Sequence, residues 1–384
     1  MKSNYLKAGF FPAFLITLVL TGTVWAEQVK GIWVVRTSIT TPEKVERVLN
    51  FAQMHGYTDL FVQVRGRGDA YYTSRIVPRT TYIPSAVYDP LADVVAGAHA
   101  RGIKVHAWIN VYLAWSARTL PADPRHVVNL HPDWVETNSK GVSDPELIAG
   151  NGRNGREGIY LSPLHPEVHN HLLAVAEEIV TQYNVDGLHL DYVRYQDRNW
   201  GYNRTARKRF LMQNSVDPIT LGNQNGSYWY RMDEEEKAAY WQRWNQFRQD
   251  AISEFVRSLD LMLEAKAPGV LLSAAVKPNP GLAQTRFFQD WPGWLRRGWM
   301  DMVVPMNYSK EVNDFKNNLY LIDQEALDRD QIYMGIATYN QASSKAAEKI
   351  IRAYQAGYND IVIFSFDTYE KNPRYFDDLH RVLK

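Results

Sequence analysis

The pattern best suited to chemistry is an acidic residue at the end of a short apolar run. Residues 187–192 follow an Asp-Gly turn, continue as a strand pattern and end in Asp191 and Tyr192, with Arg194 two positions on. Parallel barrels carry their catalytic groups at the carboxyl ends of their strands, so Asp191 is predicted to be a catalytic acid. Strand alternation places His189 on the same face. Two structural alternatives stay open: Asp191 could cap the following loop, and His189 could be a core histidine.

A second carboxylate is needed if the chemistry is cleavage of a glycosidic bond. One carboxyl group protonates the leaving oxygen, and the other carboxylate acts as nucleophile or activates water. The candidate partners of Asp191 are Asp367, Asp69 and Glu157. Asp69 could instead form a turn in its Gly-Arg-Gly-Asp segment, and Asp367 could cap a helix or pair with Arg65. Which carboxyl group donates the proton stays open at this stage.

Polar and aromatic residues gather at one end of the other strand patterns as well. Aromatic rings stack on sugars, whereas guanidinium and amide groups hold hydroxyls or acidic substituents. Lys277 and Tyr339 also end strand patterns, without an assigned role. The residues expected to bind the substrate are Gln63, Arg65, Tyr72, Trp108, Asn110, Tyr112, Trp115, Tyr192, Arg194, Asn307 and Tyr308.

Other reaction classes lack their signatures. His165, His169 and His171 lie on or beside one helix pattern without a matching acidic ligand, so no metal site is predicted. No serine nucleophile elbow and no cofactor motif are present, and a chain without cysteine has no thiol nucleophile. The sequence therefore predicts a reaction without cofactor or metal.

Strand and helix patterns alternate along the whole chain, which predicts one α/β domain folded as a (β/α)8 barrel. An open doubly wound sheet is the alternative, but no Gly-rich phosphate fingerprint follows the first strand. The eight strand patterns cover residues 32–37, 60–65, 104–112, 187–192, 270–277, 302–308, 332–339 and 361–367. The helix patterns cover residues 42–55, 90–101, 166–183, 235–265, 345–357 and 373–383.

Three long connections, 66–89, 113–163 and 196–234, follow the second, third and fourth strands. Loops of this length are usually functional, and in a barrel they would rise over the C-terminal face. Residues 159–161 could form a ninth short strand, but they are interpreted as the lead-in to the helix that starts near Pro166.

The N-terminus has the anatomy of a secretory signal peptide. A basic start is followed by an apolar run, 8–20, and by Val-Trp-Ala at 24–26, so residues 1–26 are predicted to be removed and 27–384 to form the barrel domain. The absence of cysteine excludes lipid attachment at an N-terminal cysteine, which predicts a periplasmic protein without a stable membrane anchor. A net charge of +1 gives no argument for nucleic-acid binding, whereas 12 Trp and 23 Tyr suit binding of sugars.

Several motifs together resemble the glycosyl-hydrolase-like family 10. They are KGIW (30–33), FVQVR (61–65), GDAYYTS (68–74), YDPL (88–91), GIKVHAWIN (102–110) and DGLHLDY (186–192). The resemblance implies an exported bacterial protein, often a lipoprotein, with a barrel fold and activity on cell-wall or other glycans; the lipobox cysteine is missing here.

Residues and resemblance lead to two hypotheses. The first is an exported glycoside hydrolase that acts on a polysaccharide, with peptidoglycan glycan strands favoured by the location. The second is a glycan-binding barrel without catalysis, which stays open because strand patterns five to seven end without an acid.

Overall fold

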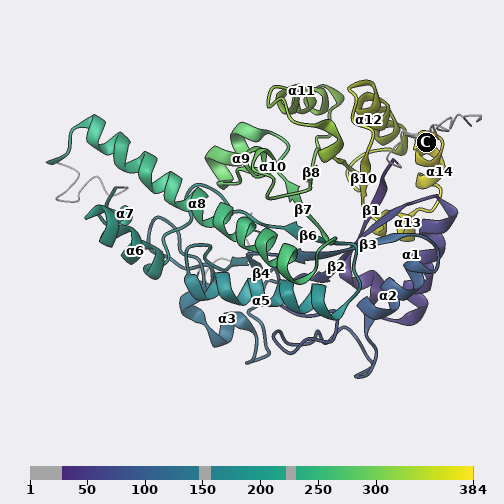
Figure 1. Ribbon diagram of the computed structural model, residues 1–384, viewed down its shortest axis with the longest axis horizontal. Helices are drawn as coiled ribbons and strands as arrows, with labels where there is room; N and C mark the ends of the chain where they lie inside the picture. The colour runs from purple at the N-terminus through teal and green to yellow at the C-terminus, as the bar shows by residue number, and fades with distance from the viewer. Residues whose placement is uncertain (1–27, 147–156, 222–230, 384) are drawn as a thin grey trace, which may run out of the picture.

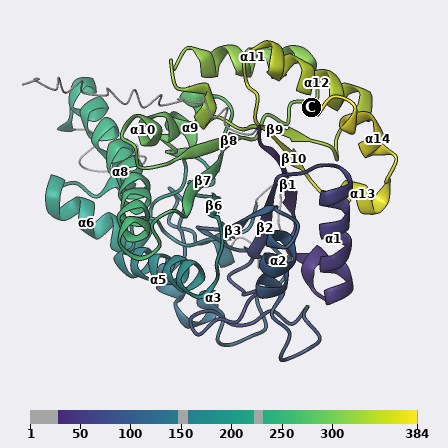
Figure 2. The same ribbon diagram turned by 45° about the vertical axis from the view of Figure 1, so that its right-hand side comes forward.

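Eight parallel strands form the centre of the computed structural model, which describes residues 28–146, 157–221 and 231–383. Their order around the sheet is β8-β7-β6-β3-β2-β1-β10-β9. Parallel bridges from Val303 to Ile332 and from Met306 to Gly335 join the two outer strands, so the ring closes (Figure 2). The predicted (β/α)8 barrel is confirmed. The strands are β1 (Lys30–Val34), β2 (Asp59–Arg65), β3 (Lys104–Asn110), β6 (Gly187–Asp191), β7 (Leu271–Val276), β8 (Met302–Pro305), β9 (Met334–Ala337) and β10 (Ile361–Phe364).

Helices surround the ring and bury its outer apolar side chains (Figure 2). Sequence signals mark several helix starts: Thr41 and Asp89 cap α1 and α2 through backbone N–H groups, and proline follows each cap. The outer helices are α1 (Pro42–Met54), α2 (Pro90–His99), α5 (Pro166–Gln182), α8 (Glu234–Lys266), α11 (Val312–Asp323), α12 (Ser343–Gln355) and α14 (Tyr375–His380). Further helices in the connections are η1 (Arg36–Ile39), α3 (Val127–Leu130), α6 (Arg204–Asn214), α7 (Pro218–Leu221), α9 (Pro280–Phe287), α10 (Trp291–Arg296) and α13 (Asp367–Lys371).

The barrel interior is filled by aromatic and aliphatic side chains. Trp33, Phe61 and Trp108 belong to one buried cluster inside the ring. Gly187 provides room for the His106 ring, because a Cβ at this position would lie 2.1 Å from His106 Nδ1. The interior is therefore a packed core, and any ligand site must lie at its mouth.

Residues 159–161 were predicted to be a helix lead-in, and that prediction is wrong. Ile159–Tyr160 is strand β5, which pairs antiparallel with β4 (Leu113–Trp115) outside the barrel sheet. Asp144 Oδ2 accepts a hydrogen bond of 2.9 Å from the Tyr160 backbone N–H. Pairing with a segment distant in the sequence therefore determines the conformation of residues 159–160, and it brings the loop after β3 to the barrel mouth.

Helix α8 is much longer than a barrel helix needs to be, and its N-terminal part extends away from the ring beside α6 and α7 (Figure 1). A separate apolar cluster forms there around Trp244, Phe210 and Tyr202. Among the described helices, none is long and apolar enough to span a membrane. The predicted signal peptide lies outside the described residues.

Candidate active site

A cavity of about 510 Å³ opens at the carboxyl ends of the strands. Its walls combine two carboxylates, three cations, two amide side chains, one serine hydroxyl and an aromatic floor. The lining residues are Trp33, Val35, Arg36, Gln63, Trp108, Asn110, Leu113, Ser116, Glu157, Asp191, Tyr192, Arg194, Ala275, Lys277, Met306, Tyr308, Tyr339 and Phe364.

Asp191 ends β6 inside this cavity, with only 8% of its surface exposed. Its neighbour in register on β3 is Asn110. The chain turns sharply at Tyr192, whose φ of 53° is unusual for an aromatic residue. This turn lets the Tyr192 backbone N–H donate a 2.7 Å hydrogen bond to Asp191 Oδ1. Backbone conformations of this kind concentrate at functional sites.

Burial controls the protonation of Asp191. Removal of water raises the pKa of its carboxyl to about 6, and the negative charge of Glu157 acts in the same direction. The Arg194 guanidinium and the Tyr192 N–H oppose this increase in the pKa. A carboxyl group with such a pKa keeps a proton available near neutral pH, as a general acid requires.

Glu157, just before β5, lines the same cavity. Arg194 holds it through two hydrogen bonds, from Nη2 to Oε1 at 2.9 Å and from Nη1 to Oε2 at 3.0 Å. The Tyr160 hydroxyl donates a further short hydrogen bond to Oε2. Burial tends to raise the pKa of Glu157, but Arg194 and Tyr160 together hold it below its ordinary value. The cavity thus contains one carboxyl with a raised pKa and one with a lowered pKa.

Amide side chains at the ends of β2 and β3 form a chain of hydrogen bonds along the cavity wall. Gln63 Nε2 donates to Asn110 Oδ1 at 3.1 Å, and Arg36 Nη1 donates to Gln63 Oε1 at 2.6 Å. Asn110 Nδ2 in turn donates to the Gly66 carbonyl at 2.8 Å. This chain of hydrogen bonds fixes the positions of the polar groups in the absence of a ligand.

His189 shares its face with Asp191, as strand alternation predicts, but lies deeper in the barrel. Trp33 Nε1 donates to His189 Nε2 at 3.1 Å, and His189 Nδ1 lies 2.9 Å from Ser273 Oγ. Burial lowers the pKa of His189 well below its ordinary value. His189 is therefore a neutral core histidine whose two ring nitrogens both have partners.

Six predicted binding residues line the cavity together with Asp191, and five others do not. Those in the cavity are Gln63, Trp108, Asn110, Tyr192, Arg194 and Tyr308. Those outside it are Arg65, Tyr72, Tyr112 and Asn307, all buried against protein atoms. Trp115 also lies outside the lining, with its indole N–H 2.5 Å from the Thr119 carbonyl.

Each of the four displaced residues has a physical reason for its position. A register shift between Gln63 and Arg65 breaks the alternation of β2, so Arg65 donates to the Asn110 and Val111 carbonyls. The Tyr72 hydroxyl lies 3.4 Å from Glu178 Oε2 of α5.

The positions of Tyr112 and Asn307 outside the cavity follow from where their strands end. Because β3 ends at Asn110, Tyr112 follows the turn into β4, and its ring packs against Phe255. Asn307 donates to the Phe315 carbonyl at 3.1 Å, on the side opposite to its neighbour Tyr308.

The other two acidic candidates lie outside the cavity lining. Asp69 Oδ1 accepts a 3.0 Å hydrogen bond from the Arg67 backbone N–H, which is the turn that its sequence context allowed. The last strand ends at Phe364, so Asp367 is the first residue of α13 and not part of a strand. Its Oδ1 lies 3.2 Å from Ser38 Oγ. Of the three proposed partners of Asp191, the structure brings only Glu157 into the cavity.

Sequence reasoning missed several cavity residues. Arg36, in the helical turn after β1, was not identified, although it lies near the end of the first strand pattern. Lys277 and Tyr339 also follow strands and were noticed only as strand ends. Interior aromatics such as Trp33 and Phe364 carry no signal that separates a cavity floor from a core.

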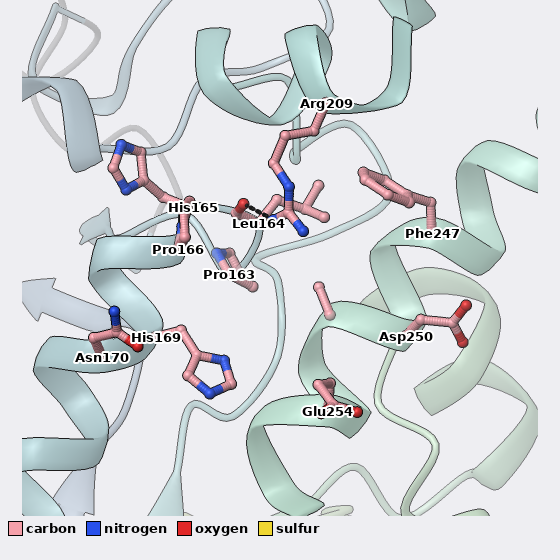
Figure 3. A pocket seen from close by; sticks show the side chains of 11 residues that line it. Pro163, Leu164, His165, Pro166, His169, Asn170, Arg209, Phe247, Asp250 and Glu254 are labelled. Atoms are coloured by element: carbon pink, nitrogen blue, oxygen red, sulfur yellow. Dashed lines mark hydrogen bonds between the residues drawn. The ribbon is translucent and has the colours of Figure 1, made fainter. Parts of the chain in front are cut away.

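A second cavity, of about 370 Å³, lies between helices and away from the strand ends (Figure 3). Asp250 and Glu254 of α8 line one side, opposite His169 of α5 and Arg209 of α6. Arg209 Nη1 already donates to the Leu164 carbonyl at 2.6 Å. None of its lining residues belongs to a barrel strand, so the barrel mouth remains the candidate site. In the part of the chain that the structure describes, no cluster of three metal-ligating side chains occurs.

The chain is similar to known glycosidase-like proteins. The family model described as glycosyl hydrolase-like 10 matches residues 23–351. Glycosyl hydrolase YngK of Bacillus subtilis is 23% identical over 313 residues, which are 74% of this chain and 53% of YngK. Glycosyl hydrolase DigH of Escherichia coli K12 is 24% identical over 326 residues, 74% of this chain and 66% of DigH. The similar region therefore spans between about half and two thirds of these relatives.

Solved structures share the fold at low sequence identity. The PgaB (BpsB) glycoside hydrolase domain from Bordetella bronchiseptica superposes with a TM-score of 0.67 at 12% identity, covering 93% of this chain and 99% of that one. A GH42 β-galactosidase from G. stearothermophilus gives a TM-score of 0.63 at 11% identity, with 92% and 55% covered. Barrels of known glycoside hydrolases thus have the architecture described above.

Proposed function

Since this chain belongs to the glycosyl hydrolase-like 10 family, we propose that it hydrolyses glycosidic bonds with Asp191 and Glu157 as the carboxylate pair. The observation that carries the proposal is the opposite shift of their two pKa values within one cavity. Asp191, with its raised pKa, protonates the leaving oxygen. Glu157, kept ionised by Arg194, acts on the sugar carbon as nucleophile or through a water molecule.

The substrate is proposed from location and chemistry together. The N-terminal sequence has the features of an export signal, and the chain has no cysteine for lipid attachment. We therefore propose a periplasmic enzyme that acts on an envelope polysaccharide, with peptidoglycan glycan strands as the first candidate. N-terminal sequencing of the exported protein should begin at Glu27; an intact Met1 would contradict export with cleavage.

A binding barrel without catalysis is the second candidate, and one observation favours it. Both oxygens of Glu157 accept hydrogen bonds from Arg194, and Tyr160 adds another. A carboxylate held so firmly is less nucleophilic than one with a free oxygen. In that case the cavity would hold a sugar chain and leave its bonds intact.

Product analysis separates the two candidates. Purified wall glycans are incubated with wild type, Asp191→Asn and Glu157→Gln, and soluble fragments are identified by mass spectrometry. Hydrolysis predicts new reducing ends with wild type and a loss of at least about a hundred-fold with either variant. Retention of glycan without fragments by all three proteins would establish the binding barrel instead.

A further inference from the structure

Lys277 stands directly after β7 at the rim of the cavity, and its backbone is fixed on both sides. Its N–H donates to Gln289 Oε1 at 2.9 Å, and its carbonyl accepts a 3.1 Å hydrogen bond from Trp291 Nε1. The base of the side chain is therefore held in place, and only the aliphatic stem and ammonium group can move within the cavity.

Within the described residues, the ammonium group of Lys277 makes no direct contact with a carboxylate, although Glu157 and Asp191 act on it through space. Its Nζ lies 4.7 Å from the centroid of the Phe287 ring, and among the described residues it has no hydrogen-bond or ion-pair partner. Burial and the neighbouring Arg194 lower the pKa of Lys277 to about 8, although the negative charges of Glu157 and Asp191 act in the opposite direction, so the group is still mainly charged at neutral pH. A partly buried ammonium without a partner is unfavourable unless a ligand supplies an anion.

Charges around the cavity agree with this role. Three cations and two carboxylates line it, and Arg194 is already engaged by Glu157. Arg36, the third cation, follows β1 on the opposite side of the ring and donates to Gln63. Strand β7 lies next to β6, so Lys277 stands one strand away from Asp191.

We propose that Lys277 determines specificity by binding a carboxylate carried by a sugar next to the glycosidic bond whose leaving oxygen Asp191 protonates. The proposal rests on the proposed function and adds the substrate class: a glycan with anionic substituents. A primary ammonium and a sugar carboxylate form a charge-assisted hydrogen bond in a partly dehydrated site. The carboxylate could belong to a lactyl ether, as in muramic acid, or to a uronic acid.

Electrostatic tuning of the catalytic pair is the competing explanation. The positive charge of Lys277 lowers the pKa values of Asp191 and Glu157. If this were its whole role, its removal would affect charged and neutral glycans alike. Ligand pairs that differ only in the carboxylate therefore distinguish the two roles.

The experiment measures binding and needs no turnover. Calorimetric titration uses full-length Asp191→Asn protein, with and without Lys277→Met or Lys277→Arg. One ligand pair is a tetrasaccharide with alternating N-acetylmuramic acid, as free acid and as methyl amide; the second is a uronic-acid tetrasaccharide and its methyl ester. Lys316→Met, on the exposed surface of α11, removes the same charge as a control. Wild-type hydrolysis is measured separately, so a failure of catalysis and a failure of this proposal remain distinguishable.

We expect the acid of at least one pair to bind about ten-fold or more tightly than its neutral form, a difference of about 1.4 kcal/mol. Lys277→Met should abolish that preference, whereas Lys277→Arg and Lys316→Met should retain it. If the Asp191→Asn protein with Lys277 intact binds the acid and neutral forms of both pairs equally, the proposal is overturned. A preference that survives Lys277→Met would also overturn it.

Discussion

Arg194 donates two hydrogen bonds to the carboxylate of Glu157, and its guanidinium lies 4.9 Å from the centroid of the Tyr192 ring. One arginine thus orders the residue after Asp191 and the carboxylate expected to work opposite Asp191. Its positive charge lowers the pKa values of both carboxyl groups, while the negative charge of Glu157 raises the pKa of Asp191. The consequences can be measured.

Asp191→Asn should lower the rate of hydrolysis by an amount that depends on how much the leaving group needs a proton. A general acid contributes roughly 10²–10⁴-fold, but only where the departing oxygen needs a proton. We expect a loss in that range on a natural glycan, with KM little changed, and a much smaller loss on an activated aryl glycoside. Steady-state kinetics on both substrates provide the test. Glu157→Gln is the control, because its loss of activity should be as large on the activated aryl glycoside as on the natural glycan. Equal losses for Asp191→Asn on both substrates would assign proton donation to another residue.

Arg194→Met should move the whole pH profile of kcat/KM to higher pH. Loss of the cation raises the pKa of Glu157, which must be ionised, and so moves the acidic limb upward. It also raises the pKa of Asp191, which must be protonated, and so moves the basic limb upward. Arg125→Met removes an exposed guanidinium as a control and should leave both limbs in place. A folded Arg194→Met protein with unmoved limbs would show that these two carboxyls do not control the rate.

The alternation of strand and helix patterns predicted the barrel. The alternation of side chains within strands predicted the inward position of Asp191, Trp108 and Asn110, because the period of two holds inside regular strands. It failed where regularity ends. The register shift in β2 turns Arg65 outward, and the early end of β10 puts Asp367 on a helix. Such irregularities depend on neighbouring strands, and single-strand patterns carry no trace of them.

Glu157 illustrates the second reason for incomplete prediction. It lies far along the chain from β6 and reaches the cavity only because β4 and β5 pair. The local sequence around Glu157 resembles a loop that precedes a helix. It therefore allows Glu157 as a partner of Asp191 but gives no reason to prefer it over Asp69 or Asp367. Arg36 was missed for a related reason, since its role depends on Gln63 of the next strand.

Two cavity aromatics should respond differently to truncation. Tyr339 is 63% exposed, so Tyr339→Ala should weaken glycan binding several-fold with little effect on thermal stability. Trp108 is only 4% exposed and packs inside the ring, so Trp108→Ala should also cost about 3–5 kcal/mol of stability. Binding titration and denaturant unfolding of the two variants check this.

Asp191 should reduce the stability of the protein at neutral pH. Its pKa rises from an ordinary value of 3.8 to about 6 on folding, so the folded state favours the protonated form. Stability from this group is fully present below the ordinary pKa and is lost as the pH rises through about 6, by an amount on the order of 3 kcal/mol. Asp191→Asn removes the charge, and the variant should therefore unfold at higher urea than wild type at about pH 8. The gain should disappear near pH 4, where the wild-type carboxyl is protonated in the folded state, and exposed Glu348→Gln should show no such pH-dependent gain. An Asp191→Asn protein that is no more stable than wild type at about pH 8 would mean that the carboxylate is well solvated, and the case for Asp191 as the proton donor would fall with it.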